Sequence, residues 1–477
     1  MSMDRRTLLK SAAAASLAGP FAGLLASPVD AAKPKQPKYP LLPVADHRDD
    51  IVRLHLPPGF NYRSFHDTST PVVLSDGTVL PGRHDGMGAF PGTDGRVTLV
   101  RNHEVNGPGP AFSSAAPVYD PMALGGTTTV DVDNRGIVAE SFASLAGTQM
   151  NCSGGIMPWG SWVTCEETVN GPDVGPDFTG APNLALTKPH GFVFEVPLDG
   201  PATGEAIHSA GRFAHEAVSF DPVDGYLYLT EDNFGFPSGF YRYLPPNHPM
   251  EVGRLEDGGQ LQMLRVKGTS NALLVEAQAK NAAFDVDWVD IDDPSPVFEY
   301  TPGSPAPTSN NTAVNYVANQ GIAQGAAQFS RLEGQVYEEG TVYFCSTQGG
   351  GEVGPNPSID GYGTGFGQVW AYDTKHHRLR LVFQSPGRAV LDFPDNVTTS
   401  PRGTLVLCED HDQDNYIRGL TPEGRISDIA LNRMAGRTGD EFAGSTFSPD
   451  GSTLFVNIQA SRGLTFAIWG PWARIGV

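Results

Sequence analysis

A short hairpin-like pattern recurs along the chain and constrains its fold more than any other feature. In each copy a strand leads into a turn ending in Gly, and a second strand closes on a polar or acidic residue. Six second strands have this form, and they begin at Gly95, Gly160, Gly225, Gly340, Gly403 and Gly451. A chain of 477 residues with short, strand-like apolar segments stays in one all-β domain only if it repeats around an axis. The sequence therefore predicts an all-β fold, a six-bladed β-propeller; the alternative is a β-rich chain whose turn glycines mark no common repeat.

The third and fourth copies of the pattern lie further apart than the others. The segment between them, from about residue 244 to 330, is predicted to be part strand, in GRLEDGGQLQMLRVKG, and part helix, in the Ala- and Gln-rich stretch before Phe329. We therefore expect an inserted β/α segment within a single propeller domain of residues 32–477.

The N-terminal residues 1–31 have the layout of a signal peptide. Arg5 and Arg6 precede Leu-Leu-Lys, an Ala- and Leu-rich stretch follows, and small residues surround Asp30. Paired arginines before a weakly hydrophobic stretch favour the twin-arginine translocase as the export partner over the general secretory route, which remains the alternative. The mature protein is thus expected in the periplasm, the cell envelope or the extracellular space.

The net charge of the chain is −21, and this excludes several classes of partner. An acidic surface disfavours nucleic acid and anionic membranes. No later stretch approaches the roughly 20 apolar residues that a membrane span needs, so we expect a soluble mature protein. A propeller completes its core without a partner, which favours a monomer.

Polar residues recur at equivalent places of the repeat. The start of the first strand and the end of the second lie at the same edge of an antiparallel hairpin, so in a propeller both face one mouth of the channel. The first strands begin with Asp85, Cys152, Glu216, Glu333 and Asp395–Asn396, and the last copy is apolar, with Phe442 just after Glu441. The second strands end with Asn102–His103–Glu104, Glu166–Glu167, Glu231–Asp232, Gln348, Glu409–Asp410 and Gln459. We expect two rings of acids to converge on one pocket.

So many like charges require compensation, because desolvation and mutual repulsion raise the pKa values of clustered carboxyl groups. Bound cations provide it, and oxygen ligands of this kind suit calcium, magnesium, manganese or iron, with more than one ion. Cys152 stands where other copies have carboxylates, and a thiolate suits a transition metal; the alternative is a small buried residue without a function. Cys165, Cys345 and Cys408 come one residue before a strand end, which predicts core thiols packed between blades.

Arg331 lies two residues before Glu333, so on a strand the two side chains face the same way. This places a permanent cation beside the predicted metal pocket, where a guanidinium could hold a phosphate oxygen bidentately. The alternative is an ordinary salt bridge between Arg331 and a neighbouring acid.

Several motifs together resemble the PhoX family of bacterial alkaline phosphatases. They are NCSGG, PWGSWVTCEE, GRFAHEA, FSRLEG, QGGG with GQVWAYD, FPDN, LVLCED and GLTPEG, in that order, and the resemblance runs from about Leu56 to the C-terminus. It implies a six-bladed propeller exported by the twin-arginine route, with iron (Fe³⁺) and calcium at the channel mouth. It also implies iron ligands at Cys152, Glu216 and Glu333, calcium ligands at Glu166, Glu409 and Asp410, and substrate-phosphate contacts from Arg331 and Asn102.

The activity that the resemblance implies is metal-dependent hydrolysis of small phosphate monoesters. Residues 244–330 and 349–366 depart from the family pattern, which leaves the substrate range open. One alternative is a calcium-dependent propeller hydrolase, such as a lactonase or a phytase-like enzyme, which shares the acid rings but has no use for Cys152. Another is a non-enzymatic binding propeller stabilised by calcium.

Overall fold

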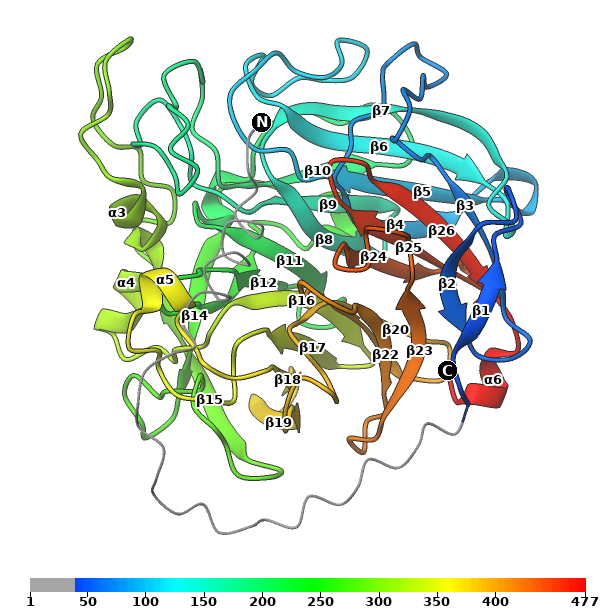
Figure 1. The fold of residues 1–477 in the computed structure, drawn as a ribbon. Helices are drawn as coiled ribbons and strands as arrows, with labels where there is room; N and C mark the ends of the chain where they lie inside the picture. The colour runs from blue at the N-terminus through cyan, green and yellow to red at the C-terminus, as the bar shows by residue number, and fades with distance from the viewer. Residues whose placement is uncertain (1–38) are drawn as a thin grey trace, which may run out of the picture.

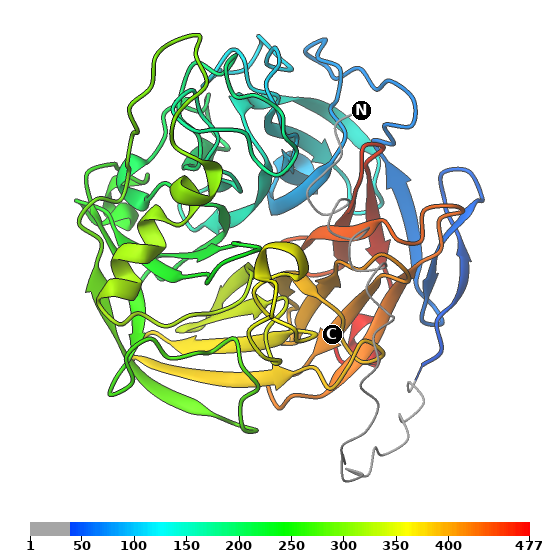
Figure 2. The same ribbon diagram turned by 60° about the vertical axis from the view of Figure 1, so that its left-hand side comes forward.

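The computed structural model describes residues 39–477, and it is built almost entirely of β-strands (Figure 1). Its sheets are arranged around a common centre (Figure 2), which confirms the predicted all-β, propeller-like fold. The predicted signal peptide, residues 1–31, lies outside the described residues. Within the described part of the chain, no helix combines the length and the apolar character needed to cross a membrane.

Six hairpins provide the strands nearest the centre. They are β4 (His84–Pro91) with β5 (Val97–His103), β8 (Asn151–Met157) with β9 (Ser161–Glu166), β11 (His215–Phe220) with β12 (Leu227–Glu231), β16 (Leu332–Glu338) with β17 (Thr341–Ser346), β20 (Pro394–Thr399) with β21 (Leu405–Glu409), and β24 (Glu441–Phe447) with β25 (Thr453–Gln459). The first strands of these hairpins contact one another in the order β4, β8, β11, β16, β20, β24 and back to β4. They form a closed ring around the centre, and we call them the inner strands.

Further strands extend each hairpin outward. They are β6 (Gly125–Val132), β7 (Val138–Thr148), β10 (Val193–Pro197), β13 (Phe240–Leu244), β14 (Gln260–Val266), β15 (Ala283–Asp290), β18 (Gln368–Asp373), β19 (Arg378–Gln384), β22 (Tyr416–Leu420), β23 (Ile426–Asn432) and β26 (Leu464–Trp469). Three N-terminal strands join the outer edges: β1 (Leu42–Ala45), β2 (Val52–Leu56) and β3 (Asn61–Phe65). Because β3 pairs with β26, an N-terminal strand completes the sheet of the C-terminal hairpin and ties the two ends of the described chain together.

The hydrogen-bonded sheets in residues 39–477 number five rather than the six that the repeat predicts. The difference comes from β15, which pairs with β14 on one side and with β19 on the other. It joins the third and fourth repeats into one nine-stranded sheet. The remaining sheets have three, four, four and six strands.

The predicted insertion supplies β14 and β15 and three helices. These are α2 (Pro249–Val252), α3 (Asn310–Val314) and α4 (Tyr316–Ala323), and the last two lie on the same side of the molecule as β14 (Figure 1). The other helical turns are short: η1 (Thr93–Gly95), η2 (His208–Ala210), α5 (Pro357–Asp360) and α6 (Trp472–Ile475). The insertion thus combines strand and helix, as the sequence predicts.

Apolar side chains fill the spaces between neighbouring sheets. Cys345 packs with Leu405 and Leu407 of the next repeat, and Cys408 packs in the same way with Val456 and Ile458. Cys165 lies in the cluster that contains Val218. All three thiols are buried, which confirms that they belong to the core.

Candidate metal centre

Each inner strand contains a β-bulge near its beginning. The pairing register shifts between His84 and Met87, Asn151 and Gly154, His215 and Val218, Leu332 and Gln335, Pro394 and Val397, and Ala443 and Thr446. A bulge bends its strand and re-aims the side chains within it. In five repeats the first bulged residue is a member of the predicted first ring, namely Asp85, Cys152, Glu216, Glu333 and Asp395. All five are buried.

The sixth repeat differs from the other five. Its bulge begins at Gly444, which has a φ of +59°, and a side chain there would collide with the backbone oxygen of Asp85. Phe442, which the sequence places at the ring, lies instead in the apolar core beside Ile458. Glu441 supplies the acid of this repeat from the first position of β24.

The clustered acids form a continuous row. Three groups of side chains each bring one potential ligand atom per residue to within 4.8 Å of one another: Cys152 with Glu167 and Glu216, Glu216 with Glu333 and Asp395, and Asp395 with Asp410 and Glu441. Glu216 and Asp395 each belong to two groups, so the row passes from β8 to β24 across the mouth of the channel. Such a row can hold more than one ion.

Glu167 and Asp410 come directly after a second strand, at equivalent places of their repeats. The backbone N–H of each donates to the carbonyl oxygen of the residue that precedes the inner strand, Met150 and Phe393 respectively. Glu104, Asp232 and Thr347 make the same bond to Arg83, Ala214 and Arg331. The repeat therefore sets the position of the second ring as well as the first.

Glu166 and Glu409 lie one residue earlier, and the structure does not bring them into the row. Glu166 accepts hydrogen bonds from the backbone N–H groups of Gly191 (2.7 Å) and Phe192 (3.1 Å). Glu409 accepts from the N–H groups of Asp392 and Tyr416 and from the Arg418 guanidinium. Both carboxylates thus hold the chain that follows their hairpin. Successive side chains point to opposite faces, but alternation alone does not say which of the two faces the centre.

Arg331 lies at the edge of the row, beside Glu333. Its Nη2 donates to Glu333 Oε1 at 2.6 Å and to Asp232 Oδ2 at 2.8 Å, and its Nε donates to Asp232 Oδ1 at 3.1 Å. The guanidinium also lies 5.8 Å from the ring centre of Phe234. The predicted proximity to Glu333 and the alternative salt bridge are therefore both present.

Asn102 is fully buried, and its amide contacts the backbone of the strand that carries Cys152. Its Nδ2 donates to the carbonyl oxygens of Cys152 (3.1 Å) and Ser153 (2.7 Å), and its Oδ1 accepts from Trp162 Nε1 (2.9 Å). These contacts position the bulge of β8.

Comparison with known proteins shows the family to which the chain belongs. The family model described as alkaline phosphatase PhoX matches residues 40–140 and 134–461. The chain belongs to the PhoX alkaline phosphatase family. This confirms the resemblance carried by the sequence motifs. No curated protein sequence matches the chain.

Among solved structures, Pseudomonas fluorescens PhoX in complex with vanadate, a transition state analogue, has a TM-score of 0.60 and 18% identity, covering 91% of this chain and 98% of that one. It shares the fold. A gluconolactonase, XC5397 from Xanthomonas campestris, has a TM-score of 0.38 and 12% identity, covering 90% and 97%. Virginiamycin B lyase from Staphylococcus aureus has a TM-score of 0.35 and 12% identity, covering 86% and 99%.

The electrostatics of the row in this PhoX family member suit bound cations. Burial, followed by the charges of Glu216 and Glu167, raises the pKa of the Cys152 thiol well above its usual value. Burial, followed by Asp232, Asp395 and Glu216, raises the pKa of Glu333 in the same direction. A nearby cation reverses both effects, since it favours the charged forms. The donor set fits two kinds of metal: thiolate with carboxylates suits a transition metal, and carboxylates alone suit calcium.

Proposed function

We propose that the chain hydrolyses phosphate monoesters with iron (Fe³⁺) and calcium held at the mouth of the channel. The observation that carries the proposal is the continuous row of buried acids ending in Cys152, in a chain of the PhoX alkaline phosphatase family. The similar Pseudomonas fluorescens protein binds vanadate as a transition state analogue, which supports phosphoryl chemistry for this chain.

The proposed iron ligands are Cys152, Glu216 and Glu333. The proposed calcium ligands are Asp395, Asp410 and Glu441, because this group offers only carboxylate oxygens. Glu167 is proposed as a ligand in place of Glu166, and Asp410 is retained without Glu409, since the carboxylates of Glu166 and Glu409 bind backbone N–H groups. Asn102 is proposed to position Cys152.

In the reaction, a water oxygen forms the new bond to phosphorus while the ester P–O bond breaks, which yields an alcohol and inorganic phosphate. Bound cations supply Lewis acidity toward the phosphoryl oxygens. Asp232 holds the Arg331 guanidinium through Nε and Nη2, so this donor is oriented before substrate arrives. A preorganised guanidinium stabilises charge that develops on the phosphoryl oxygens.

The organisation of the whole chain follows from the same reasoning. The ring of six inner strands supports a count of six blades, in which the nine-stranded sheet comprises two blades joined by β15. Residues 1–31 are proposed as a twin-arginine signal and residues 32–477 as a single, monomeric catalytic propeller that is exported after folding. A site built from repeats far apart in sequence exists only in the folded chain, so loading the metals before export favours this route.

The test is to measure metal content and turnover together on the purified mature protein. We expect iron and calcium in the protein, hydrolysis of p-nitrophenyl phosphate, and loss of that activity on chelation. Glu333→Gln should abolish turnover while the circular dichroism spectrum stays that of a folded protein. A calcium-only protein that opens lactones would instead establish the lactonase alternative, and a metal-bound protein without turnover would favour a binding propeller.

A further inference from the structure

A cavity of about 330 Å³ lies directly beside the proposed metal centre. Two residues that line the cavity also belong to the metal centre or contact it. Glu167 belongs to the Cys152 group and lines the cavity, and Phe234 lines the cavity and also contacts the Arg331 guanidinium. A molecule bound in this space therefore borders both the proposed metals and the proposed phosphate-binding arginine.

The walls of the cavity come from segments outside the repeated hairpins. They are the connections from β9 to β10 and from β12 to β13, the insertion around α3, Ser358 in the connection from β17 to β18, and Met150 and Ala214, which directly precede β8 and β11. Two of these segments, around α3 and at Ser358, lie within residues 244–330 and 349–366. The cavity is thus built by connecting loops rather than by the strands of the propeller.

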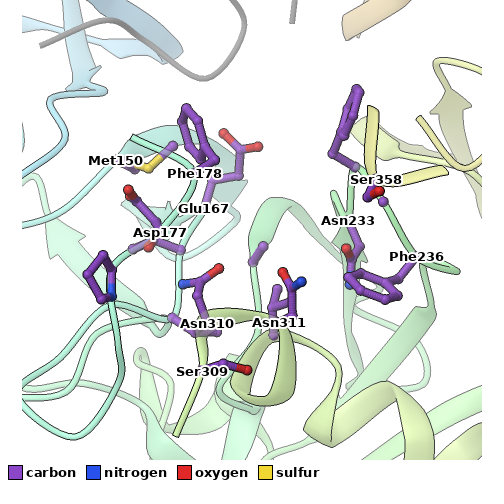
Figure 3. A pocket seen from close by; sticks show the side chains of 17 residues that line it. Met150, Glu167, Asp177, Phe178, Asn233, Phe236, Ser309, Asn310, Asn311 and Ser358 are labelled. Carbon is purple, nitrogen blue, oxygen red and sulfur yellow. The ribbon is translucent and has the colours of Figure 1, made fainter. Parts of the chain in front are cut away.

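The lining combines aromatic rings with amide groups (Figure 3). Phe178 stands beside Glu167 on one side, and Phe236 and Asn233 stand on the other. Asn310 and Asn311 lie between these two sides and reach into the cavity. Aromatic side chains bind flat rings by stacking, and amides offer both donors and acceptors to the edge of such a ring.

A buried ion pair holds two walls of the cavity together. Arg212 forms a bidentate pair with Asp173, at 2.6 and 2.9 Å, in the segment that follows β9. The same guanidinium donates to the carbonyl oxygen of Pro296 in the insertion, and Asp173 accepts from the N–H of Phe298. The cavity is therefore preformed, which lowers the entropic cost of binding a ligand there.

We propose that this cavity binds the leaving group of the phosphoester and selects a planar aromatic group with a hydrogen-bonding edge. The inference rests on the proposed phosphatase function and adds the substrate class to it. A simple aryl group uses only the rings, whereas a nucleobase uses the rings and the amides. Small alkyl leaving groups reach neither.

The experiment compares three substrates, ethyl phosphate, phenyl phosphate and adenosine 5′-monophosphate, in the metal-loaded full mature protein and its variants. For each substrate the ratio of kcat/KM between variant and wild type is used, because this ratio removes the intrinsic reactivity of the leaving group. Phe236→Leu should lower kcat/KM about tenfold for the two aromatic substrates and leave ethyl phosphate unchanged. Asn311→Ala should lower it for the nucleotide alone; since Asn311 is exposed, this change leaves the fold intact. Phe142→Leu, at an exposed position of β7, is the matched control and should change none of the three.

Binding of adenosine, measured by calorimetry, separates this proposal from the proposed function. Adenosine should bind the wild-type protein and bind Asn311→Ala more weakly. Adenosine binding without turnover of any phosphoester would contradict the proposed phosphatase activity but would still support the cavity as a ligand-binding site. Turnover without adenosine binding, or equal losses on all three substrates, would overturn the leaving-group site.

Discussion

Glu166 and Glu167 are adjacent in the sequence, yet their carboxylates serve opposite sides of one strand end. Glu166 accepts hydrogen bonds from the backbone N–H groups of Gly191 and Phe192, and its Oε1 lies 2.6 Å from His190 Nδ1. Glu167 lies in the group with Cys152 and Glu216. One side chain thus holds the chain that leads to the third strand, while its neighbour faces the proposed metals.

Substitution of Glu167 should therefore affect metal binding, whereas substitution of Glu166 should affect stability. Glu167→Gln should lower the metal content and the turnover of p-nitrophenyl phosphate without changing the melting temperature of the chelated protein. Glu166→Gln should destabilise the chelated protein by about 1–3 kcal/mol, because a buried hydrogen-bonded charge is replaced by a group that satisfies the N–H donors poorly. Elemental analysis and thermal unfolding measure the two effects, and the reverse assignment of effects would contradict this division of roles.

Arg331 should act on substrate from the orientation that Asp232 gives its guanidinium. Arg331→Lys should lower kcat/KM for p-nitrophenyl phosphate by about a hundredfold, since an ammonium cannot reproduce the two-point contact with Asp232 that orients the donor toward the transition state. Metal content should stay at the wild-type level. Arg242→Lys is the control: Arg242 packs between the rings of Tyr226 and Trp288 on the outer strands. Equal losses in both variants would indicate a general effect of replacing a packed arginine.

Most members of the first ring could be predicted because they occupy the same position in each repeat. Asp85, Cys152, Glu216, Glu333 and Asp395 each stand at the start of a first strand, and local pattern alone identifies that position. The bulges then turn these side chains toward the centre. In each of these five repeats the bulge falls at the ring residue. The ring residues could therefore be identified without knowing which residues of the two strands pair.

The features that sequence analysis missed depend on non-local pairing or on side-chain direction. Whether Glu166 or Glu167 faces the centre depends on which residue is the last to pair with the inner strand. Glu441 replaces Phe442 in the row because the sixth repeat bends at Gly444. The merging of two repeats through β15 depends on pairing with β19, which lies far along the chain. A local pattern in the sequence does not show which distant strand a given strand will pair with.

The ion pair of Arg212 and Asp173 should determine both stability and the shape of the cavity. Both side chains are buried, so Asp173→Ala leaves an uncompensated charge and should lower the free energy of unfolding by about 3–5 kcal/mol. Asp173→Asn retains an acceptor for the Phe298 N–H, so it should lower the free energy of unfolding by less. Chemical denaturation of both variants checks the order. An unchanged unfolding midpoint in Asp173→Ala would show that the loop after β9 does not depend on this pair.

His66 should make the protein less stable in mild acid. Burial, together with the neighbouring Arg101, lowers the pKa of His66 to about 3, and the Arg101 guanidinium donates to its Nδ1 at 3.2 Å. The other titratable groups that act on this cluster, His84 and His103, also have lowered pKa values because they are buried beside Arg101.

In the unfolded chain His66 takes up a proton as the pH falls through about 6.5, whereas the folded protein does not, so stability is lost below that pH. At pH 5 this one residue should lower the free energy of unfolding by at most about 2 kcal/mol relative to pH 7. Denaturant unfolding at the two pH values should show a smaller difference for His66→Gln than for the wild type. Identical pH dependence in the wild type and His66→Gln would mean that His66 titrates alike in the folded and unfolded states.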